Sequence, residues 1–295
     1  MRSTRLSALV VASTVLAWPA AAQTITIGLD VAGSQQTEIY KINDDGDMVG
    51  AYVDATGRHG FLRTEGTDLT LDVPAADWTM ASGLTNRDAN GKITLVGQYW
   101  SSNRLQGFFA EYDPNAGADP LTYTLTPAAT RVHTMPWDIN DGQVIVGCTH
   151  SAGAADMLPW LLVGGSFLTA AEQSSMYTGI NRSGGITGFW YEPSLAGGRS
   201  FILKGQTTEW FSAFGSARYT RSHDINDSGD SVGFYWGQPG NPGRHGFVRL
   251  ADGTTTSFDV PGAVMTHAYG INNSGVIVGA YRDSSGAWHG FRRDP

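Results

Sequence analysis

Two histidines, an arginine and a tyrosine are the residues of this sequence best suited to acid–base chemistry. His223 or His267, paired with a tyrosine such as Tyr281, can donate and accept protons near neutral pH, while Arg221 binds a carboxylate. These residue types suit a lyase that acts on uronic-acid-containing glycans, and also some hydrolases. We therefore take His223, His267, Tyr281 and Arg221 as candidate catalytic residues.

Aromatic side chains beside polar ones also suit a site that only binds. Flat rings provide apolar contact for a sugar or an aromatic polymer fragment, and Arg, Asn and Asp side chains provide hydrogen bonds. Such a site needs one shallow patch and no tuning of pKa values. The candidate ligand-binding residues are His133, His150, Trp100, Trp190, Tyr235, Trp236 and Asp224.

No metal and no cofactor is predicted. The candidate histidines lack the spacing of a metal-ligand motif. The acidic stretch INDDGD, residues 42–47, resembles a calcium loop, but an EF-hand register on Gly46 puts Lys41 at the first ligand position and Tyr52 at the last. A hairpin turn with Asx-type hydrogen bonds explains the stretch better.

The elements that position these side chains recur along the chain. A glycine in VGAY-like segments returns at spacings of 47, 50, 41, 45 and 46 residues, and an aromatic residue keeps the same rhythm. The glycines are Gly50, Gly97, Gly147, Gly188, Gly233 and Gly279, and the aromatic residues are Phe61, Phe108, Trp160, Phe201, Phe247 and Phe291. Each repeat predicts four short strands separated by turns rich in Gly, Asn, Asp and Ser. Four antiparallel strands in about 45 residues are typical of a propeller blade.

We therefore predict an all-β fold, a six-bladed β-propeller of four-stranded blades. The last repeat stops at WHGFRRDP without a fourth strand, whereas the segment after residue 23 begins TITIGLDVAGS and matches TTTSFDVPGAV, residues 254–264. The N-terminal strand is expected to complete the last blade and to remove its exposed edge. This strand order places all seven histidines at one end of the propeller.

Three of the histidines occupy one motif position, at the start of the third strand. They are His59, His245 and His289, each followed by Gly-Phe. Their equivalent positions on the outer part of each blade are too far apart to share one metal ion. We predict a structural role, with the imidazole hydrogen-bonded to a loop or a backbone carbonyl.

The INxxGxIVGxY, HGF and DVPGA elements, which cover nearly the whole chain after residue 22, resemble the extracellular repeats of the HAF family. That family usually has His-Ala-Phe at the third strand. Here the motif is His-Gly-Phe in the first, fifth and sixth repeats and departs further in the second to fourth, as in Gln106-Gly107-Phe108. The resemblance implies a repeat type and export, and it implies no particular reaction.

Composition and the N-terminus indicate an exported protein. Residues 1–22 combine Arg2 and Arg5 with an apolar run and a small-residue end, as in a secretory signal peptide, so residues 23–295 form the single propeller domain. Losing the two arginines changes the formal charge from −8 to −10, which disfavours nucleic acid and anionic membranes as partners. Cys148 is the only cysteine, so no intramolecular disulfide forms. We expect a secreted or periplasmic monomer.

The preferred function is the binding of an extracellular ligand, a carbohydrate or other polymer fragment, at a histidine- and aromatic-rich channel mouth. A secreted lyase or hydrolase that uses the His, Tyr and Arg side chains is the first alternative. A cell-surface scaffold for protein interactions is the second.

Overall fold

The computed structural model describes residues 23–117, 121–125, 132–151, 156–170, 174–192 and 197–295. The predicted signal peptide, residues 1–22, lies outside these ranges. No α-helix occurs within them, and no described segment is a helix long and apolar enough to cross a membrane. The prediction of an all-β fold is confirmed.

Half of the 24 strands in the described ranges form three separate four-stranded antiparallel sheets. The first sheet contains β2 (Gln36–Ile42), β3 (Met48–Val53), β4 (Arg58–Thr64) and β5 (Thr67–Leu71). The second contains β6 (Trp78–Leu84), β7 (Ile93–Ser101), β8 (Arg104–Tyr112) and β9 (Leu121–Leu125). The third contains β10 (His133–Ile139), β11 (Ile145–His150), β12 (Leu158–Val163) and β13 (Ser166–Thr169).

The other twelve strands form one sheet, which consists of three antiparallel runs of four. The first run is β14 (Ser175–Ile180), β15 (Ile186–Tyr191), β16 (Gly198–Lys204) and β17 (Thr207–Phe211). The second is β18 (Tyr219–Ile225), β19 (Ser231–Gln238), β20 (Asn241–Arg249) and β21 (Thr255–Phe258). The third is β22 (Met265–Ile271), β23 (Ile277–Arg282), β24 (Trp288–Arg293) and β1 (Ile25–Ile27).

The expected six separate blades therefore appear as four sheets. One parallel residue pair joins each run of the large sheet to the next, Gly198 with Tyr219 and Arg244 with Met265. These two backbone contacts merge three runs that are otherwise antiparallel within themselves.

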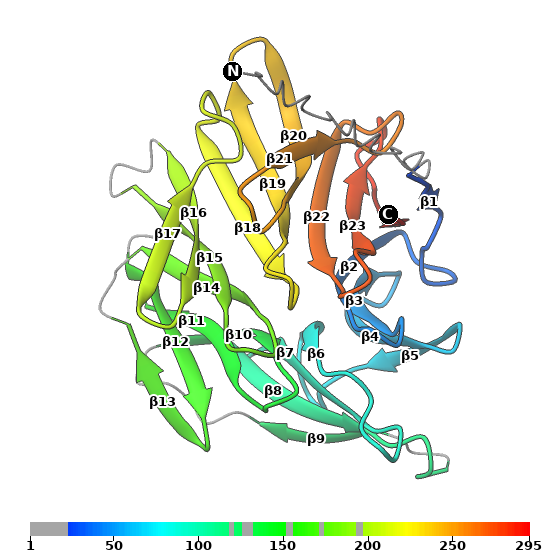
Figure 1. Ribbon diagram of the computed structural model, residues 1–295. Helices are drawn as coiled ribbons and strands as arrows, with labels where there is room; N and C mark the ends of the chain where they lie inside the picture. Colours follow the sequence, from blue (N-terminus) through cyan, green and yellow to red (C-terminus); the bar gives the residue numbers. More distant parts are fainter. Residues whose placement is uncertain (1–22, 118–120, 126–131, 152–155, 171–173, 193–196) are drawn as a thin grey trace, which may run out of the picture.

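The four-strand runs follow one another around a central axis, as the colours in Figure 1 show. Strands such as β2, β6 and β18 lie toward the middle, and β5, β9 and β13 lie outside. β2 packs against β22, β23 and β24, so the first and the last repeat lie side by side. β1 pairs with β24, from Ile25 opposite Arg293 to Ile27 opposite Phe291, which confirms the predicted pairing of the N-terminal strand with the last repeat.

The glycine and aromatic markers of the repeat lie opposite each other on the second and third strands of each run. Gly97 pairs with Phe108, and the other five glycines pair with their aromatic partners in the same way. A Cβ atom on Gly97 would lie 2.5 Å from the Phe108 ring and 2.2 Å from the Met80 carbonyl oxygen. Only glycine lets the buried ring lie across the neighbouring strand, so the sequence period is the period of these packed rings.

The Ile-Asn turns tie neighbouring repeats together around the axis. The side-chain amide of Asn181 donates to the Asn226 carbonyl at 3.0 Å, that of Asn226 to Asn272 at 3.3 Å, and that of Asn272 to Asn43 at 3.1 Å. Within its own turn, Asn43 Oδ1 accepts the Asp47 N–H at 2.8 Å. The predicted Asx-type hairpin turn is therefore present, and its asparagine also links the last repeat to the first.

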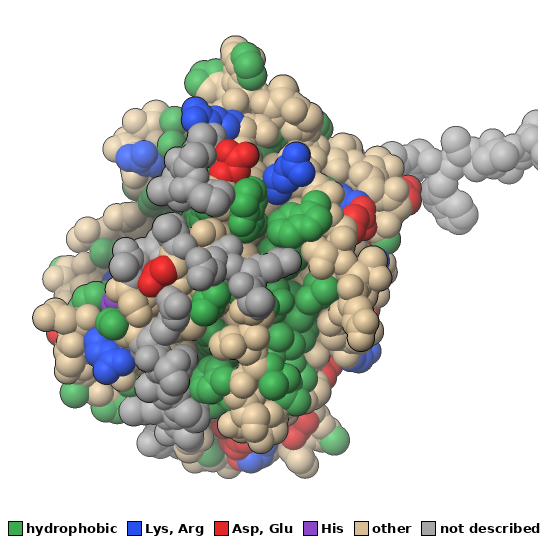
Figure 2. All heavy atoms as spheres, turned by 90° about the vertical axis from the view of Figure 1, so that its left-hand side faces the viewer, with side chains coloured by type: hydrophobic (Ala, Val, Ile, Leu, Met, Phe, Trp, Pro, Cys, Tyr) green, Lys and Arg blue, Asp and Glu red, His purple; other side chains and the backbone are tan. Residues whose placement is uncertain are grey.

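One side of the molecule, formed by strands at the left of Figure 1, exposes hydrophobic side chains among polar ones (Figure 2). Val163 on β12, Leu168 on β13 and Trp210 on β17 are 41%, 57% and 40% exposed. They are spread over two sheets, and scattered hydrophobic side chains are ordinary on a protein surface. Charged groups buried near the axis are more informative.

Candidate functional site

A triad of buried charges lies on the axis. Lys41 on β2 donates to Asp138 on β10 at 2.5 Å and also to Asp224 on β18. All three side chains come from the residue just before the Ile of an Ile-Asn turn, where a β-bulge interrupts the first strand. The equivalent residues of the three intervening runs are Gly83, Gly179 and Gly270.

The triad satisfies its own charges. Burial raises the pKa of Asp138 to about 7 although Lys41 opposes the shift, and burial also raises the pKa of Asp224. The two carboxylates outweigh burial at Lys41 and raise its pKa. Asp224 also accepts the N–H groups of Ile225 and Ile271, both at 2.7 Å. Asp224 was predicted to bind ligand, but its carboxylate is fully buried and already bonded, so we no longer assign it to the ligand.

Lys41 lines a hollow on each side of the triad. On one side the Ile-Asn turns surround a hollow that we call the asparagine mouth. Arg182 forms ion pairs there with Asp44, Asp141 and Asp227, at 3.3 to 3.7 Å. The Arg182 guanidinium therefore neutralises part of the negative charge of these three aspartates.

The hollow on the other side is small. Tyr40, Trp137, His223 and Tyr269 help to line a cavity of ≈ 10 Å³, about the minimum for one water molecule. This cavity has no room for a larger molecule. We call the following cluster of side chains the arginine mouth: Tyr40, Arg58, Tyr191, Arg221, His223, Phe234, Trp236, Arg244, His267 and Tyr269.

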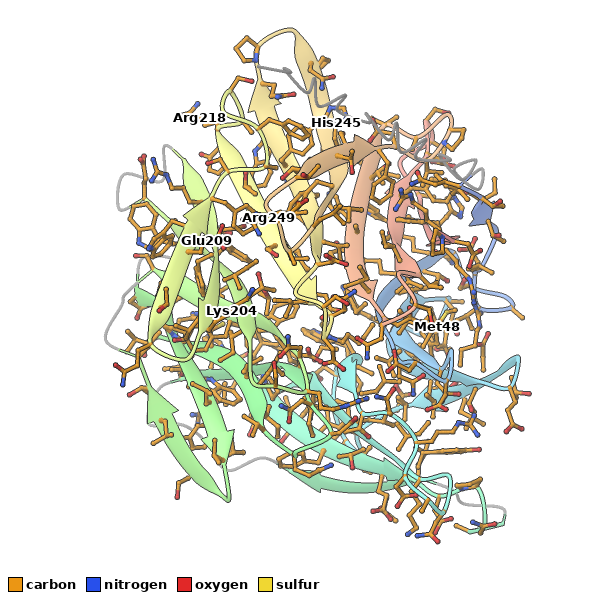
Figure 3. The ribbon with its side chains drawn as sticks, in the orientation of Figure 1. Met48, Lys204, Glu209, Arg218, His245 and Arg249 are labelled. Carbon is orange, nitrogen blue, oxygen red and sulfur yellow. The ribbon has the colours of Figure 1, made fainter. Side chains whose placement is uncertain are left out.

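Residues that Figure 3 labels lie toward opposite ends of the strands. Arg218 and His245 lie at the arginine-mouth end of β18 and β20, and the Arg218 N–H donates to the Trp236 carbonyl at 3.1 Å. Lys204 lies toward the opposite end, where it lines a hollow with Asn181 and Asp227. Two of the predicted site histidines, His223 and His267, lie in the arginine mouth.

Two arginines lie over one tryptophan in the arginine mouth. The guanidinium carbons of Arg221 and Arg244 are each 5.1 Å from the Trp236 ring centroid. Arg221 Nη2 donates to the Tyr191 hydroxyl, and Arg221 Nε is buried without a partner. Within the described ranges, neither arginine forms an ion pair with a carboxylate. Burial, with Arg244 as a like charge nearby, lowers the pKa of Arg221. Two guanidinium groups without a counter-charge are suited to bind a carboxylate.

Two neutral histidines stand beside these arginines. The ring of His267 stacks on Phe234 with centroids 3.8 Å apart, and that of His223 stacks on Phe234 at 5.3 Å. His267 Nδ1 lies 2.8 Å from the Tyr269 hydroxyl. Burial and the neighbouring arginines lower the pKa of His223 to about 3 and the pKa of His267 well below its usual value. Both rings are therefore neutral near pH 7, and Nε2 of each is buried without a partner.

The tyrosine of the site is Tyr269, and the prediction of Tyr281 is wrong in position. Tyr281 lies opposite Thr266 in the sheet, so its side chain projects from the other face of the strand pair than His267. Its ring packs on His289, with centroids 5.3 Å apart. Tyr269, two residues beyond His267 on the same strand, could have been found from that spacing.

The predicted ligand-binding residues separate into groups. Trp236 lies in the arginine mouth. Trp100, His133 and His150 form a row on the second and third sheets: the His133 ring is 5.9 Å from Trp100 and 4.6 Å from His150. His133 Nδ1 accepts the Leu105 N–H at 3.0 Å.

Trp190 and Tyr235 have packing partners outside the arginine mouth. Trp190 contacts Trp210 edge to face, with ring centroids 6.4 Å apart. Tyr235 is buried, and its hydroxyl lies 2.9 Å from Ser257 Oγ. The structure gives neither residue a place at the site.

The histidines of the third-strand motif hold carboxylates. The Nδ1–Oδ2 distances are 2.8 Å for His59–Asp72, 2.8 Å for His245–Asp259 and 2.7 Å for His289–Asp30. Each aspartate belongs to a DVPGA-like segment, so the two sequence motifs contact each other in these three repeats. The acceptor is a carboxylate instead of the predicted loop or backbone carbonyl, and it fixes the fourth strand to the third.

Sequence reasoning missed Arg58 and Arg244, which immediately precede His59 and His245. Arg58 Nη2 donates to the Tyr40 hydroxyl at 2.8 Å and to Glu38 at 3.3 Å. Alternation along a strand sends the residue before a structural histidine to the opposite face, which was the available signal.

Two other chemistries find no support. In the described part of the chain, no three His, Cys, Asp or Glu side chains are grouped to hold a metal ion. GDSVG, Gly229–Gly233, matches the G-x-S-x-G pattern of hydrolase elbows. However, Ser231 is fully buried at the start of a hairpin strand, whereas the elbow needs a strand-to-helix turn that exposes the hydroxyl.

Solved structures that resemble this chain are β-propellers or contain one. No protein-family model matches the sequence, and a search of curated proteins finds no match. The chain is similar to an acylaminoacyl peptidase of Pyrococcus horikoshii (TM-score 0.52, 8% identity, 89% of this chain and 52% of that one). It is also similar to TolB of Acinetobacter baumannii (0.51, 10%, 88% and 64%) and to regucalcin, a calcium-binding protein of Agrobacterium tumefaciens (0.50, 13%, 88% and 90%). The chain thus spans about half of the peptidase. At these identities the likeness establishes the β-propeller fold alone.

Proposed function

We propose that this protein is an exported β-propeller that binds an acidic carbohydrate or similar polymer fragment, with a carboxylate held at the arginine mouth. The observation that carries the proposal is the pair Arg221 and Arg244, which lie over Trp236 and form no ion pair with any carboxylate in the described part of the chain. A guanidinium forms paired hydrogen bonds with a carboxylate, and an aromatic ring offers apolar contact to the face of a sugar. Glu38, an acid at this mouth, is already paired with Arg58 at 3.3 Å.

The neutral histidines support the same kind of ligand. Nε2 of His223 and Nε2 of His267 are buried without partners, and such atoms are costly unless something completes their hydrogen bonds. A polyhydroxylated ligand offers both donors and acceptors. This chemistry favours sugars over purely apolar compounds.

The fold arrangement is part of the proposal. We infer that the twelve-stranded sheet acts as three blades, so the ring has six blades with β1 completing the last. The signal-peptide pattern supports a secreted or periplasmic location, and the repeat motifs support a place among HAF-type repeat proteins. We also propose that the protein acts as a monomer.

Calorimetry with a uronic-acid oligomer and its methyl ester tests the binding site. Because each charged hydrogen bond contributes roughly 1.5–3 kcal/mol, Arg221→Gln and Arg244→Gln should each weaken uronate binding about tenfold or more. Arg182→Gln, at the asparagine mouth, is the matched control and should leave the affinity unchanged. Equal affinity for the acid and the ester would contradict carboxylate recognition.

The pairing of His267 with Tyr269 favours one second candidate, a lyase. A neutral imidazole nitrogen can remove the proton α to a uronate carboxylate. The electron pair then forms a C=C bond as the β C–O bond breaks, and the departing oxygen takes a proton from a phenol such as Tyr269. Ultraviolet absorbance of the unsaturated product tests this reaction. Product formation that His267→Gln abolishes would establish the lyase, whereas binding without product would leave the binding function alone.

A further inference from the structure

Three runs carry a pair of rings at one register position, where the first strand begins and the second strand ends. The pairs are Trp78–Trp100, His133–His150 and Tyr219–Trp236. Equivalent register in equivalent strands places all three pairs at the same end of the propeller. The third pair belongs to the arginine mouth, because Arg221 and Arg244 both lie over the Trp236 ring. Trp236 also stacks on Tyr219, with ring centroids 4.4 Å apart.

The first two pairs form a continuous row. The ring centroids of Trp78 and Trp100 are 6.4 Å apart with planes at 10°, and those of Trp100 and His133 are 5.9 Å apart at 18°. His150 follows at 4.6 Å from His133. We call these four side chains the aromatic row. All four are partly exposed, and the row crosses from the second sheet to the third.

Arg58 joins the aromatic row to the arginine mouth. Its guanidinium carbon lies 5.7 Å from the Trp78 ring centroid, and its Nη2 donates to the Tyr40 hydroxyl. Tyr40 packs on Tyr269, with ring centroids 5.1 Å apart. Arg58 Nε is buried without a partner. A cation with an unused donor therefore stands between the two groups of rings.

A cross-strand ring pair stabilises a sheet by about 0.2–1 kcal/mol, and it does so within one sheet. The stacking of Trp100 on His133 instead aligns rings of different sheets. A row of rings that begins beside the Arg58 cation matches a chain of sugars that carries carboxylates.

We propose that the aromatic row provides further subsites for an acidic oligosaccharide, whose end unit is held by its carboxylate at the arginine mouth. This inference rests on the proposed function and adds the length of the ligand to it. The ligand is a chain of uronic acid units that extends from the arginine mouth over Trp78 and Trp100. A single uronate fills only the arginine mouth.

Calorimetry with a single uronate, a disaccharide and a long oligouronate tests the aromatic row. The native protein should bind the long oligomer more tightly than the single unit. Because one lost ring contact contributes about 0.5–1.5 kcal/mol, Trp78→Ala and Trp100→Ala should each weaken binding of the long oligomer about three- to tenfold. Both variants should bind the single uronate like the native protein. Trp190→Ala, a tryptophan packed on Trp210, is the matched control and should change neither affinity.

Each outcome bears on one of the two proposals. Affinity that does not depend on oligomer length, or tryptophan variants that bind the long oligomer like the native protein, would overturn the aromatic row and leave the arginine mouth standing. Failure of every uronate to bind would overturn the proposed function and this inference with it. If Trp100→Ala does not fold by circular dichroism, Trp78→Ala and Trp100→Phe decide, since the phenyl ring should retain most of the long-oligomer affinity.

Discussion

The buried triad makes Lys41 the residue whose loss should cost the most stability for a single charge. Lys41→Met keeps much of the side-chain volume and removes the cation that Asp138 and Asp224 share. Both carboxyls are almost completely buried, so no solvent replaces the lost ammonium group. The change leaves two buried acids next to each other without a counter-charge.

The magnitude follows from the cost of neutralising these acids. Removing one partner of a buried ion pair costs about 3–5 kcal/mol. Protonation limits the loss, because protonating a carboxyl with an ordinary pKa of about 3.9 costs about 4 kcal/mol at pH 7, at about 1.4 kcal/mol per pH unit. The pKa of Asp138 is already raised to about 7, so the new cost falls mainly on Asp224. We expect a loss of about 4 kcal/mol at pH 7.

The sign of the pH dependence is part of the prediction. In the variant the folded state holds these protons more tightly than the unfolded chain does, because burial raises both carboxyl pKa values. Stability therefore falls as pH rises from about 4 toward 7, by up to about 1.4 kcal/mol per pH unit for each carboxyl. The deficit relative to the native protein should be small near pH 4 and largest near pH 7.

Urea unfolding of the native protein and of Lys41→Met at pH 4 to 7 measures this deficit. Lys92→Met is the matched control, since Lys92 also pairs with two acids, Glu111 at 2.8 Å and Asp113 at 3.0 Å, but at the surface. Exposed ion pairs contribute about 0–1 kcal/mol, so this variant should lose little at any pH. A Lys41→Met loss no greater than that of Lys92→Met, or a loss independent of pH, would refute the reasoning.

Three further predictions concern titration and packing. Asp30 and Asp283 outweigh burial and raise the pKa of His289, so the stabilisation by His289 is present below about pH 6.5 and is lost as pH rises through the folded pKa. An NMR titration should give His289 a pKa above 6.5, and Asp30→Asn should lower it. A pKa at or below about 6.5 would contradict the pairing. The lowered pKa of His223, about 3, makes stability fall as pH drops from about 6.5 toward 3, because the unfolded chain binds the proton first. His223→Phe should flatten that part of the curve of unfolding free energy against pH, measured with urea. An unchanged slope would count against a neutral buried ring. Gly97→Ala should lower the free energy of unfolding by about 3 kcal/mol or more, because the new Cβ atom clashes with Phe108. The control Gly215→Ala, whose Cβ atom meets no atom within 4 Å, should change it by no more than about 0.5 kcal/mol. Equal effects in calorimetric unfolding would show that the ring does not require glycine.

The repeat architecture was predictable because it depends on local pattern. The glycine and aromatic periods identify second and third strands that must pair for the ring to pack, as Gly97 and Phe108 do. The pairing of β1 with β24 also follows from matching the two chain ends to one repeat. The number of sheets did not follow, because single backbone contacts such as that of Gly198 with Tyr219 depend on the distance between neighbouring runs.

The candidate site was predictable only in part. Three of the four proposed catalytic residues, Arg221, His223 and His267, do lie together, because all come from first strands around the axis. Tyr281 failed because strand alternation turns it to the other face. Arg244 was missed because it comes from a third strand, and only the packing of that strand beside Trp236 brings it to the mouth.

The sequence by itself determined the β-propeller class, the pairing of the chain ends and the end of the molecule at which the histidines gather. Those features depend on spacing and alternation along strands, which a period of about 45 residues encodes directly. Only the tertiary structure decided which charges meet. Lys41, Asp138 and Asp224 lie in three different repeats and look like ordinary turn residues in the sequence, yet the radial arrangement places them in contact on the axis. Within the described ranges, the same arrangement leaves Arg221 and Arg244 without an ion-paired carboxylate, which supports the proposed ligand site at their end of the propeller.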